Sequence, residues 1–422
     1  MKYVIIGNSA AAIGAVEGIR KVDQQGSITL ISSEPYHTYS RPLISYWLGG
    51  QVTEDNMVYR KLDFYEKNHV ETILGVAATG IDTQGKQVLL ADGRQINYDQ
   101  VLIATGGKPF VPPTPGLDKS NVHTFIKMDD VKALKELAVP GSKAVIIGAG
   151  LIGLKAAEGL AKLGVEITVV ELANRVLSAI LDEEAAGTVQ AHLERQGIKF
   201  ELNTTVESVA GQAQATAVKL TNGNTLACDF LIVAIGVIPN IDVVANTDIK
   251  LNRGIQVDDT LATNVDGVFA AGDVSEGYDV IYQTNRVLPI LPNAYRQGEV
   301  AGMNMARQVT HYAGGFAMNA IGFFGMTMIT AGIIKPEGEE FEVLTQGTIQ
   351  PPQYKKVVLR DNKIVGFIFL NSIDRAGILT DLIASQEDVS SFKQYLLAED
   401  FGYNYFPETM RKEKLMKGRA AL

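Results

Sequence analysis

The stretch KAVIIGAGLIGLKAAEGLAKLGVEITVVE, residues 143–171, decides how this chain is expected to fold. An apolar strand over Lys143–Ile147 leads into the turn GAGLIG, residues 148–153, and a helix over Leu151–Leu163 follows. A second apolar strand then ends at Glu171. The glycines keep side chains away from the turn, so a pyrophosphate can reach the amide groups at the helix N-terminus. The stretch therefore predicts a βαβ unit that binds a dinucleotide.

The same pattern occurs at the N-terminus. A strand over Tyr3–Ile6, a turn at Gly7 and a helix over Ala10–Arg20 precede a strand over Ser27–Ile31, which leads to Glu34. One glycine turn alone is a weak signal, because ordinary α/β turns also contain glycine. Two turns, each followed by a carboxylate after the second strand, are a strong signal and predict two dinucleotide sites.

Small residues complete the first turn, because Ser9 and Ala12 stand where the ideal pattern has glycine. In the second site Glu171 favours NADH over NADPH, because its carboxylate accepts a hydrogen bond from a ribose hydroxyl and its negative charge repels a 2′-phosphate. Arg175 nearby is interpreted as a structural or adenine-stacking residue. The residues expected to line the two nucleotides are Gly7, Ser9, Ala10, Ala11, Glu34, Ala104, Thr105, Gly106, Gly148, Gly150, Leu151, Ile152, Gly153, Glu171 and Gly236.

A third element contributes a carboxylate. The strand Val268–Ala271 ends in Gly272 and Asp273, which places one carboxylate at the carboxyl edge of a parallel sheet, where a ligand hydroxyl can bind. A helix is expected to begin near Asn293 and Ala294.

Composition excludes several classes of function. The net charge of −9 and the pI near 5.2 argue against a nucleic-acid binder. The single cysteine, Cys228, excludes an intrachain disulfide, a CxxC pair and a cysteine-held cluster, and it fits a reducing compartment, so a cytoplasmic location is expected. Residues 308–334 carry no formal charge, but repeated glycines favour short buried strands over a membrane span. No metal site is expected.

The motifs GNSAAA, ATGGKP, GAGLIG, AIGVIPN and the Gly-Asp segment occur in the order found in one superfamily. Together they resemble the pyridine nucleotide-disulfide oxidoreductases, in the NADH-dependent class that includes rubredoxin and ferredoxin reductases, and the NADH-oxidising half of assimilatory nitrite reductase. The resemblance covers about three quarters of the chain. It implies FAD and NAD(H) as cofactors, and it implies that Asp273 binds the FAD ribitol and Glu34 the adenosine ribose. Arg41 and Pro42 match the segment that runs past the isoalloxazine and the pyrophosphate.

The fold class expected is α/β, with two Rossmann-like three-layer domains, the NAD domain inserted in the FAD domain, and a small α+β C-terminal domain. The strand and turn at 231–240 repeat those at 101–107, as such an insertion predicts. The boundaries are 1–115 and 242–317 for the FAD domain, 116–241 for the NAD(H) domain and 318–422 for the C-terminal domain. In the last domain, strands over Tyr354–Arg360 and Ile364–Asn371 and a helix over Arg375–Ala384 are expected. The resemblance implies that this domain helps to build a homodimer.

Two departures from the family pattern matter. Pro42 stands where disulfide reductases, peroxidases and water-forming oxidases of the family have a redox cysteine, and Cys228 is interpreted as a buried apolar residue. Without a thiol relay, electrons must leave FAD directly, which favours a small iron–sulfur or rubredoxin-type carrier as partner. The helix at Asn293 would direct its N-terminus at the flavin pyrimidine.

The second departure is Lys155, where the family usually has glutamate. One hypothesis places this lysine close to the flavin as a catalytic residue that favours the reduced, anionic form. The alternative is a solvent-facing lysine or an ion pair with Glu158. For His37 a packing role is favoured over a catalytic one, and the basic run Arg411–Arg419 is interpreted as a solvated tail rather than a docking patch for an acidic ferredoxin.

The leading hypothesis for function is an NADH-linked flavoenzyme that exchanges electrons with a one-electron carrier protein. Two alternatives stay open from the sequence. One is a peroxide-forming NADH oxidase, which would consume oxygen in step with NADH. The other is a non-enzymatic, NADH-sensing interaction subunit, which would change its association state when NADH binds.

Overall fold

The computed structural model describes residues 1–348 and 352–420, and the chain divides into two compact units. The larger unit contains Met1–Asn174 and Gly197–Gly315, and the smaller contains Arg175–Gln196 and Phe316–Leu422. Both glycine turns lie in the larger unit. The mixed α/β class with parallel sheets is confirmed, while the predicted division into domains stays a prediction.

The first sheet is parallel, with the strand order β19-β7-β1-β2-β3. Its strands are β1 (Lys2–Ile6), β2 (Ser27–Ser32), β3 (Val70–Leu74), β7 (Gln100–Ile103) and β19 (Val268–Ala270). Strand β19 pairs with β7 although it lies far along the chain, with Val268 opposite Val101. The chain therefore leaves this sheet after β7 and later returns to complete it.

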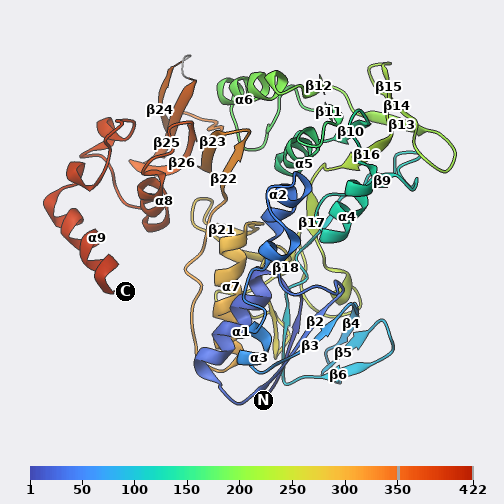
Figure 1. The fold of residues 1–422 in the computed structure, drawn as a ribbon. Helices are drawn as coiled ribbons and strands as arrows, with labels where there is room; N and C mark the ends of the chain where they lie inside the picture. The colour runs from blue at the N-terminus through green and yellow to red at the C-terminus, as the bar shows by residue number, and fades with distance from the viewer. Residues whose placement is uncertain (349–351, 421–422) are drawn as a thin grey trace. The chain divides into compact units, whose positions relative to one another are not determined.

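Helices α1 (Ala10–Val22) and α7 (Leu291–Met305) pack side by side on this sheet (Figure 1). Glycines make the close approach possible, because a Cβ atom on any of four of them would overlap backbone atoms of the opposite helix; these are Gly14, Gly18, Gly298 and Gly302. The small side chains of α1 thus serve packing as well as the turn before it.

The second sheet is also parallel, with the order β12-β11-β10-β16-β9. Its strands are β9 (Val122–His123), β10 (Lys143–Ile147), β11 (Glu166–Glu171), β12 (Lys199–Leu202) and β16 (Phe230–Val233). Helix α5 (Leu151–Ala161) connects β10 to β11, and α4 (Met128–Leu137) follows β9. The βαβ unit expected at residues 143–171 is confirmed.

Smaller elements complete the larger unit. The three-stranded sheets comprise β4 (Ala78–Asp82), β5 (Gln87–Leu90) and β6 (Gln95–Asn97); β13 (Val206–Ala210), β14 (Ala217–Leu220) and β15 (Thr225–Ala227); and β18 (Ile255–Gln256), β20 (Ser275–Asp279) and β21 (Thr284–Val287). The chain crosses between the two main sheets twice. The two crossing segments contain β8 (Gly107–Pro109) and β17 (Val237–Pro239), which pair antiparallel with each other. Two short helices, α2 (Ile44–Leu48) and α3 (Phe64–Lys67), lie between β2 and β3 in the chain.

The smaller unit contains an antiparallel sheet with the order β22-β23-β26-β25-β24. Its elements are β22 (Met318–Phe323), β23 (Met326–Gly332), β24 (Phe341–Thr348), β25 (Gln353–Arg360), β26 (Lys363–Leu370), α6 (Glu183–Arg195), α8 (Ala376–Ser385) and α9 (Glu408–Ala420). The expected strands around the turn at Asp361 and the helix after Arg375 are confirmed. So are short strands in the charge-free stretch 308–334. Of the helices in the described ranges, none has the length and apolarity that a membrane crossing needs.

Candidate functional site

The first glycine turn joins β1 to α1. Gly7 has φ +131°, in the region that favours glycine, and a Cβ there would overlap the Ala104 carbonyl of the neighbouring strand end. Ser9 is the N-cap of α1, and its side chain makes no capping hydrogen bond. The first turn of α1 also lacks acidic residues. This helix N-terminus therefore suits an anionic ligand group.

Three of the predicted site residues, Ala11, Gly272 and Ala294, lie close together beside this turn. A Cβ on Gly272 would lie 3.1 Å from Cβ of Ala11 and 3.4 Å from Cβ of Ala294. The Gly272 amide donates to Oε1 of Gln297 at 2.7 Å, which fixes the strand end against α7. Asn293 lies in the first turn of α7 and is buried. The structure thus brings the end of β19 together with the first turns of α1 and α7.

Asp273 carries a carboxylate without a protein donor. In the described residues no hydrogen bond reaches its side chain, and burial raises its pKa to about 6, although Arg41 opposes this shift. The side chain is partly buried, and an acceptor withdrawn from water without a donor is costly, so such groups in native proteins are explained by a bound ligand, ion or water. The Asp273 carboxylate is therefore suited to accept hydrogen bonds from ligand hydroxyls.

Glu34 is buried after β2 and engages two side chains of the next loop. Arg41 Nη2 lies 2.6 Å from Oε1 of Glu34, and the Tyr39 hydroxyl donates to Oε2 at 2.7 Å. Arg41 also donates to the Ile126 carbonyl at 2.9 Å. Each carboxylate oxygen keeps a further lone pair for a ligand hydroxyl. Sequence reasoning missed Tyr39, for which the only signal was its place between two candidate residues.

Neighbouring positions show how the strand ends are tied. Thr105 donates through Oγ1 to the Asn240 carbonyl at 2.7 Å, which links the two passages between the sheets. Gly106 has φ +68° and faces open space. Pro42 lies in a short 3-10 helix, Arg41–Leu43, directly before α2.

The second glycine turn joins β10 to α5. Gly148 has φ +107°, and a Cβ on Gly153 would overlap the Gly148 carbonyl. In contrast, a Cβ on Gly150, the N-cap of α5, would meet nothing within 4 Å. Gly236, with φ +118°, also faces open space. The turn is thus tight on its inner side and accessible on its outer side, as a pyrophosphate site requires.

Glu171 supports this turn. Its Oε2 accepts from the Ala149 amide at 2.7 Å, and its Oε1 accepts from the Ala173 amide at 2.8 Å. Leu172, directly after it, is 70% exposed. The carboxylate therefore lies beside the glycine turn, at the position from which it can reach a ribose.

Lys155 lies in a buried setting on α5. Its Nζ forms an ion pair with Glu158 and lies 4.4 Å from the ring centroid of Tyr46 in α2. The ion pair between Lys155 and Glu158, one of the alternatives that the sequence left open, is therefore present. The expected proximity of Lys155 to a flavin stays a prediction.

Two further candidates have structural partners. His37 Nε2 lies 3.0 Å from the Arg60 carbonyl, and its ring meets Tyr65 edge to face. In the basic run, Lys412 pairs with Glu408, and Lys414 pairs with Asp381 at 2.8 Å. These contacts favour a packing role for His37, and they pair both lysines in the part of the basic run whose side chains the structure describes, residues 411–416. Among the residues that the structure describes, no group of His, Cys, Asp and Glu could hold a metal ion.

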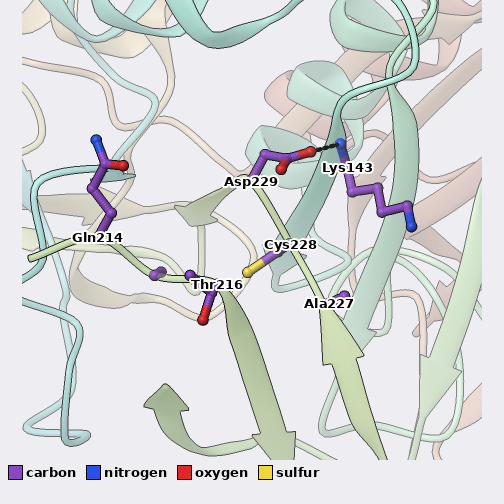
Figure 2. Close-up of a pocket in the computed structure, with 7 residues that line it drawn as sticks. Lys143, Gln214, Thr216, Ala227, Cys228 and Asp229 are labelled. Atoms are coloured by element: carbon purple, nitrogen blue, oxygen red, sulfur yellow. Dashed lines mark hydrogen bonds between the residues drawn. The ribbon is translucent and has the colours of Figure 1, made fainter. Parts of the chain in front are cut away.

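Cys228 is buried just before β16, at the amino ends of the strands of the second sheet. Figure 2 shows it in a pocket with Lys143 and Asp229, where the Lys143 amide donates to Asp229 at 2.7 Å. Lys143 begins β10 and Gly148 follows its end, so the strand separates this pocket from the glycine turn by roughly 15 Å. Burial raises the pKa of the Cys228 thiol to about 11. The thiol is therefore protonated at neutral pH and unsuited to electron relay.

We expect Cys228→Ala to leave NADH-driven electron transfer unchanged within about twofold, because a protonated, buried thiol is not a redox relay. Steady-state rates with ferricyanide or a rubredoxin as oxidant, together with FAD content, measure this. A large loss of rate in a variant that keeps its FAD would contradict the assignment.

The residues at the first turn fit FAD. The turn has an accessible helix N-terminus, Glu34 keeps lone pairs for a ribose, and the Asp273 carboxylate is partly buried and has no donor among the described residues. The second turn offers the same features for NAD(H), since Gly150 faces open space and Glu171 lies beside it. Two dinucleotides can thus be held in one unit of the protein.

Comparison with known proteins gives consistent results. The family described as "Pyridine nucleotide-disulphide oxidoreductase" matches residues 1–298. The chain is 32% identical to the NADH-dependent phenylglyoxylate dehydrogenase subunit epsilon of Aromatoleum evansii, with 94% of each chain covered. It is 31% identical to the assimilatory nitrate reductase electron transfer subunit of Bacillus subtilis over 94% of this chain, but it spans only 51% of that relative. A crystal structure of NADH:rubredoxin oxidoreductase from Clostridium acetobutylicum is similar, with TM-score 0.75, 26% identity and coverage of 93% and 97%.

Proposed function

The chain belongs to the pyridine nucleotide-disulphide oxidoreductase family, and from this premise we propose that it passes electrons between NAD(H) and a small one-electron carrier protein. It is an FAD-dependent oxidoreductase with FAD and NAD(H) as cofactors. The observation that carries the proposal is the pair of glycine turns in one unit, each with a carboxylate after the second strand.

Bound FAD would supply the conversion of a two-electron hydride donor into single electrons. The residues proposed to hold it surround the first turn: Gly7, Ser9, Ala10, Ala11, Glu34, Arg41, Pro42, Ala104, Thr105, Gly106, Gly272, Asp273, Asn293 and Ala294. Those proposed to hold NAD(H) surround the second: Gly148, Gly150, Leu151, Ile152, Gly153, Glu171 and Gly236. The protein's own task is to orient the two rings and to exclude water, because hydride transfer depends on alignment more than on an acid or base.

The carrier is proposed to be a rubredoxin-type or other iron–sulfur protein. The position of Pro42 and the buried thiol of Cys228 support this, since neither offers a dithiol that could accept an electron pair. Similarity to an NADH:rubredoxin oxidoreductase supports the same class of partner. The cytoplasmic location and the homodimer expected from the sequence are part of this proposal, and sedimentation of the purified protein tests the second.

An acceptor screen tests the function. The FAD-loaded protein is mixed with NADH without oxygen and then offered rubredoxin, ferredoxin or oxygen in turn. We expect a carrier protein to reoxidise the flavin much faster than oxygen does. Oxygen consumption that matches NADH loss, with no preference for a carrier, would instead identify an NADH oxidase. A flavin that NADH reduces very slowly, with an NADH-dependent change in association state, would identify a sensing subunit.

Glu171→Gln should weaken the preference for NADH over NADPH by about 10–100-fold, because it removes the charge that binds ribose hydroxyls and repels a 2′-phosphate. The ratio of the two dissociation constants, measured by titration of the FAD-loaded protein, checks this. Glu166 begins the same strand and is exposed, so Glu166→Gln is a matched control. An unchanged ratio in Glu171→Gln would exclude the assigned role.

A further inference from the structure

The short helix α2 lies against both nucleotide-domain helices, α4 and α5. It directly follows the Arg41–Leu43 segment, which is proposed to run past the flavin. Each of its two aromatic side chains, Tyr46 and Trp47, is in cation–π contact with a lysine from one of those helices. Lys155 of α5 lies over Tyr46 at 4.4 Å, and Lys135 of α4 lies over Trp47 at 4.5 Å.

The contact with α5 is the more buried of the two. The Lys155 side chain is 11% exposed, and that of its ion-pair partner Glu158 is 8% exposed. Lys162 lies one helical turn after Glu158, and its Nζ is 3.2 Å from Oε1 of Glu158. The same Nζ donates to Oε1 of Gln51 at 2.6 Å. One buried carboxylate on α5 thus holds two lysines that both reach toward the segment of α2.

The backbones are close at the same place. A Cβ on Gly159 would lie 3.0 Å from the Ser45 carbonyl and 3.1 Å from side-chain atoms of Leu48. Glycine at this position lets α5 approach α2 to backbone distance, and the lysines fix the contact on either side of it. The relative position of the two helices is therefore held by directional contacts as well as by apolar packing.

The contact between Lys155 and Tyr46 links the glycine turn of the nucleotide site to the segment proposed to run past the flavin. Lys155 lies two residues after Gly153, the last glycine of the nucleotide turn, and Tyr46 lies four residues after Pro42. We propose that Lys155 is a positioning residue which, held by Glu158 and seated on Tyr46, sets the distance between the nucleotide turn and the flavin segment. This inference rests on the proposed function.

The proposal differs from an electrostatic role at the flavin. An ammonium group that shares a buried ion pair with a carboxylate adds little net field at a distance. A positioning role predicts a change in the rate of hydride transfer without a change in flavin potential, because the reaction is steeply sensitive to alignment.

The test compares Tyr46→Leu, Tyr46→Phe and Lys155→Met in the FAD-loaded protein. Stopped-flow mixing with NADH gives the rate of flavin reduction at saturation and the dissociation constant of NADH. We expect Tyr46→Leu and Lys155→Met to reduce the flavin about 10–100-fold more slowly, with the dissociation constant and the flavin midpoint potential unchanged. Tyr46→Phe keeps the aromatic face and should behave as the wild type.

A second readout is independent of turnover. Amide hydrogen exchange of residues 44–51 in the FAD-loaded protein, measured without NADH, should become faster in Tyr46→Leu and Lys155→Met but not in Tyr46→Phe. Lys135→Met is the matched control, since it removes the other lysine–aromatic contact of α2 without touching α5. It should leave the rate of flavin reduction unchanged.

Three results would overturn the inference: a wild-type rate in Tyr46→Leu, an equal loss in Tyr46→Phe, or a potential shift that accounts for the slower reduction. Failure of the proposed function looks different, because the wild-type protein would then either show very slow flavin reduction by NADH or pass its electrons to oxygen with no preference for a carrier protein.

Discussion

Gly298→Val should abolish the stable, FAD-loaded protein. A Cβ at this position would overlap the backbone of Ala11, at the point where α1 and α7 pack closest to the first glycine turn. The helices must separate to admit the side chain, which moves Ala11 and Ala294 away from Gly272. Overpacking of this kind, against backbone that cannot yield, is expected to cost roughly 3 kcal/mol or more. Denaturant unfolding and the FAD content of the purified protein measure it.

Gly187→Ala is the control for this prediction. Gly187 lies inside helix α6, and a Cβ there would meet nothing within 4 Å. This substitution should stabilise the protein by about 0.5–1 kcal/mol through helix propensity alone. If Gly298→Val folded with normal stability and retained FAD, the close packing of α1 on α7 would not support the first turn as described.

Asp273→Asn should change two properties in opposite directions. It should weaken FAD binding by about 10–100-fold, because a charged acceptor for ligand hydroxyls is replaced by a neutral amide. It should also stabilise the FAD-free protein at pH 8 by up to about 3 kcal/mol, because it removes a partly buried charge that has no donor and a raised pKa. Fluorescence titration with FAD and chemical unfolding of the FAD-free protein measure the two effects.

The pH dependence follows from the raised pKa of Asp273. Its pKa is about 6 in the folded protein and lower when unfolded, so the folded state binds the extra proton between these values. The stability of the FAD-free protein should therefore fall as pH rises from about 4 to about 6 and stay lower above that range. In Asp273→Asn this fall should be absent. Asp266→Asn, at a carboxylate that is almost fully exposed, should leave both properties unchanged. A normal FAD affinity in Asp273→Asn would contradict the role assigned to this residue.

The elements that sequence predicts well are those with a strong local pattern. The two βαβ units follow from apolar strands, glycine turns and alanine-rich helices, and their observed bounds agree to within a few residues. The hairpin of β25 and β26 is also predicted, because its turn uses Asp361 and Asn362, which both have positive φ.

The elements that sequence misses depend on tertiary contacts. Helix α2 has five residues, too few for helical periodicity to be visible. The segment containing α6 groups with the C-terminal residues, because Tyr354 and Lys356 both contact Asp182 at its N-cap. No local pattern in residues 175–196 indicates these partners.

The candidate site shows the same division. The glycines and the carboxylates Glu34, Glu171 and Asp273 could be predicted, because their chemistry requires these residue types at these strand ends. The ion pair of Lys155 with Glu158 was one of the alternatives, since their spacing brings them together on one helix face. Its contact with Tyr46 could not be predicted, because that residue is more than a hundred positions away in the chain.

One titration tests the central claim most directly. The purified protein, with its FAD content measured, is titrated with NADH under anaerobic conditions, and Cys228→Ala is treated in the same way. We predict that both proteins bind FAD and that NADH bleaches the flavin fully in each, including the variant that has no thiol. A protein that takes up no FAD, or a bound flavin that NADH leaves oxidised, would contradict it.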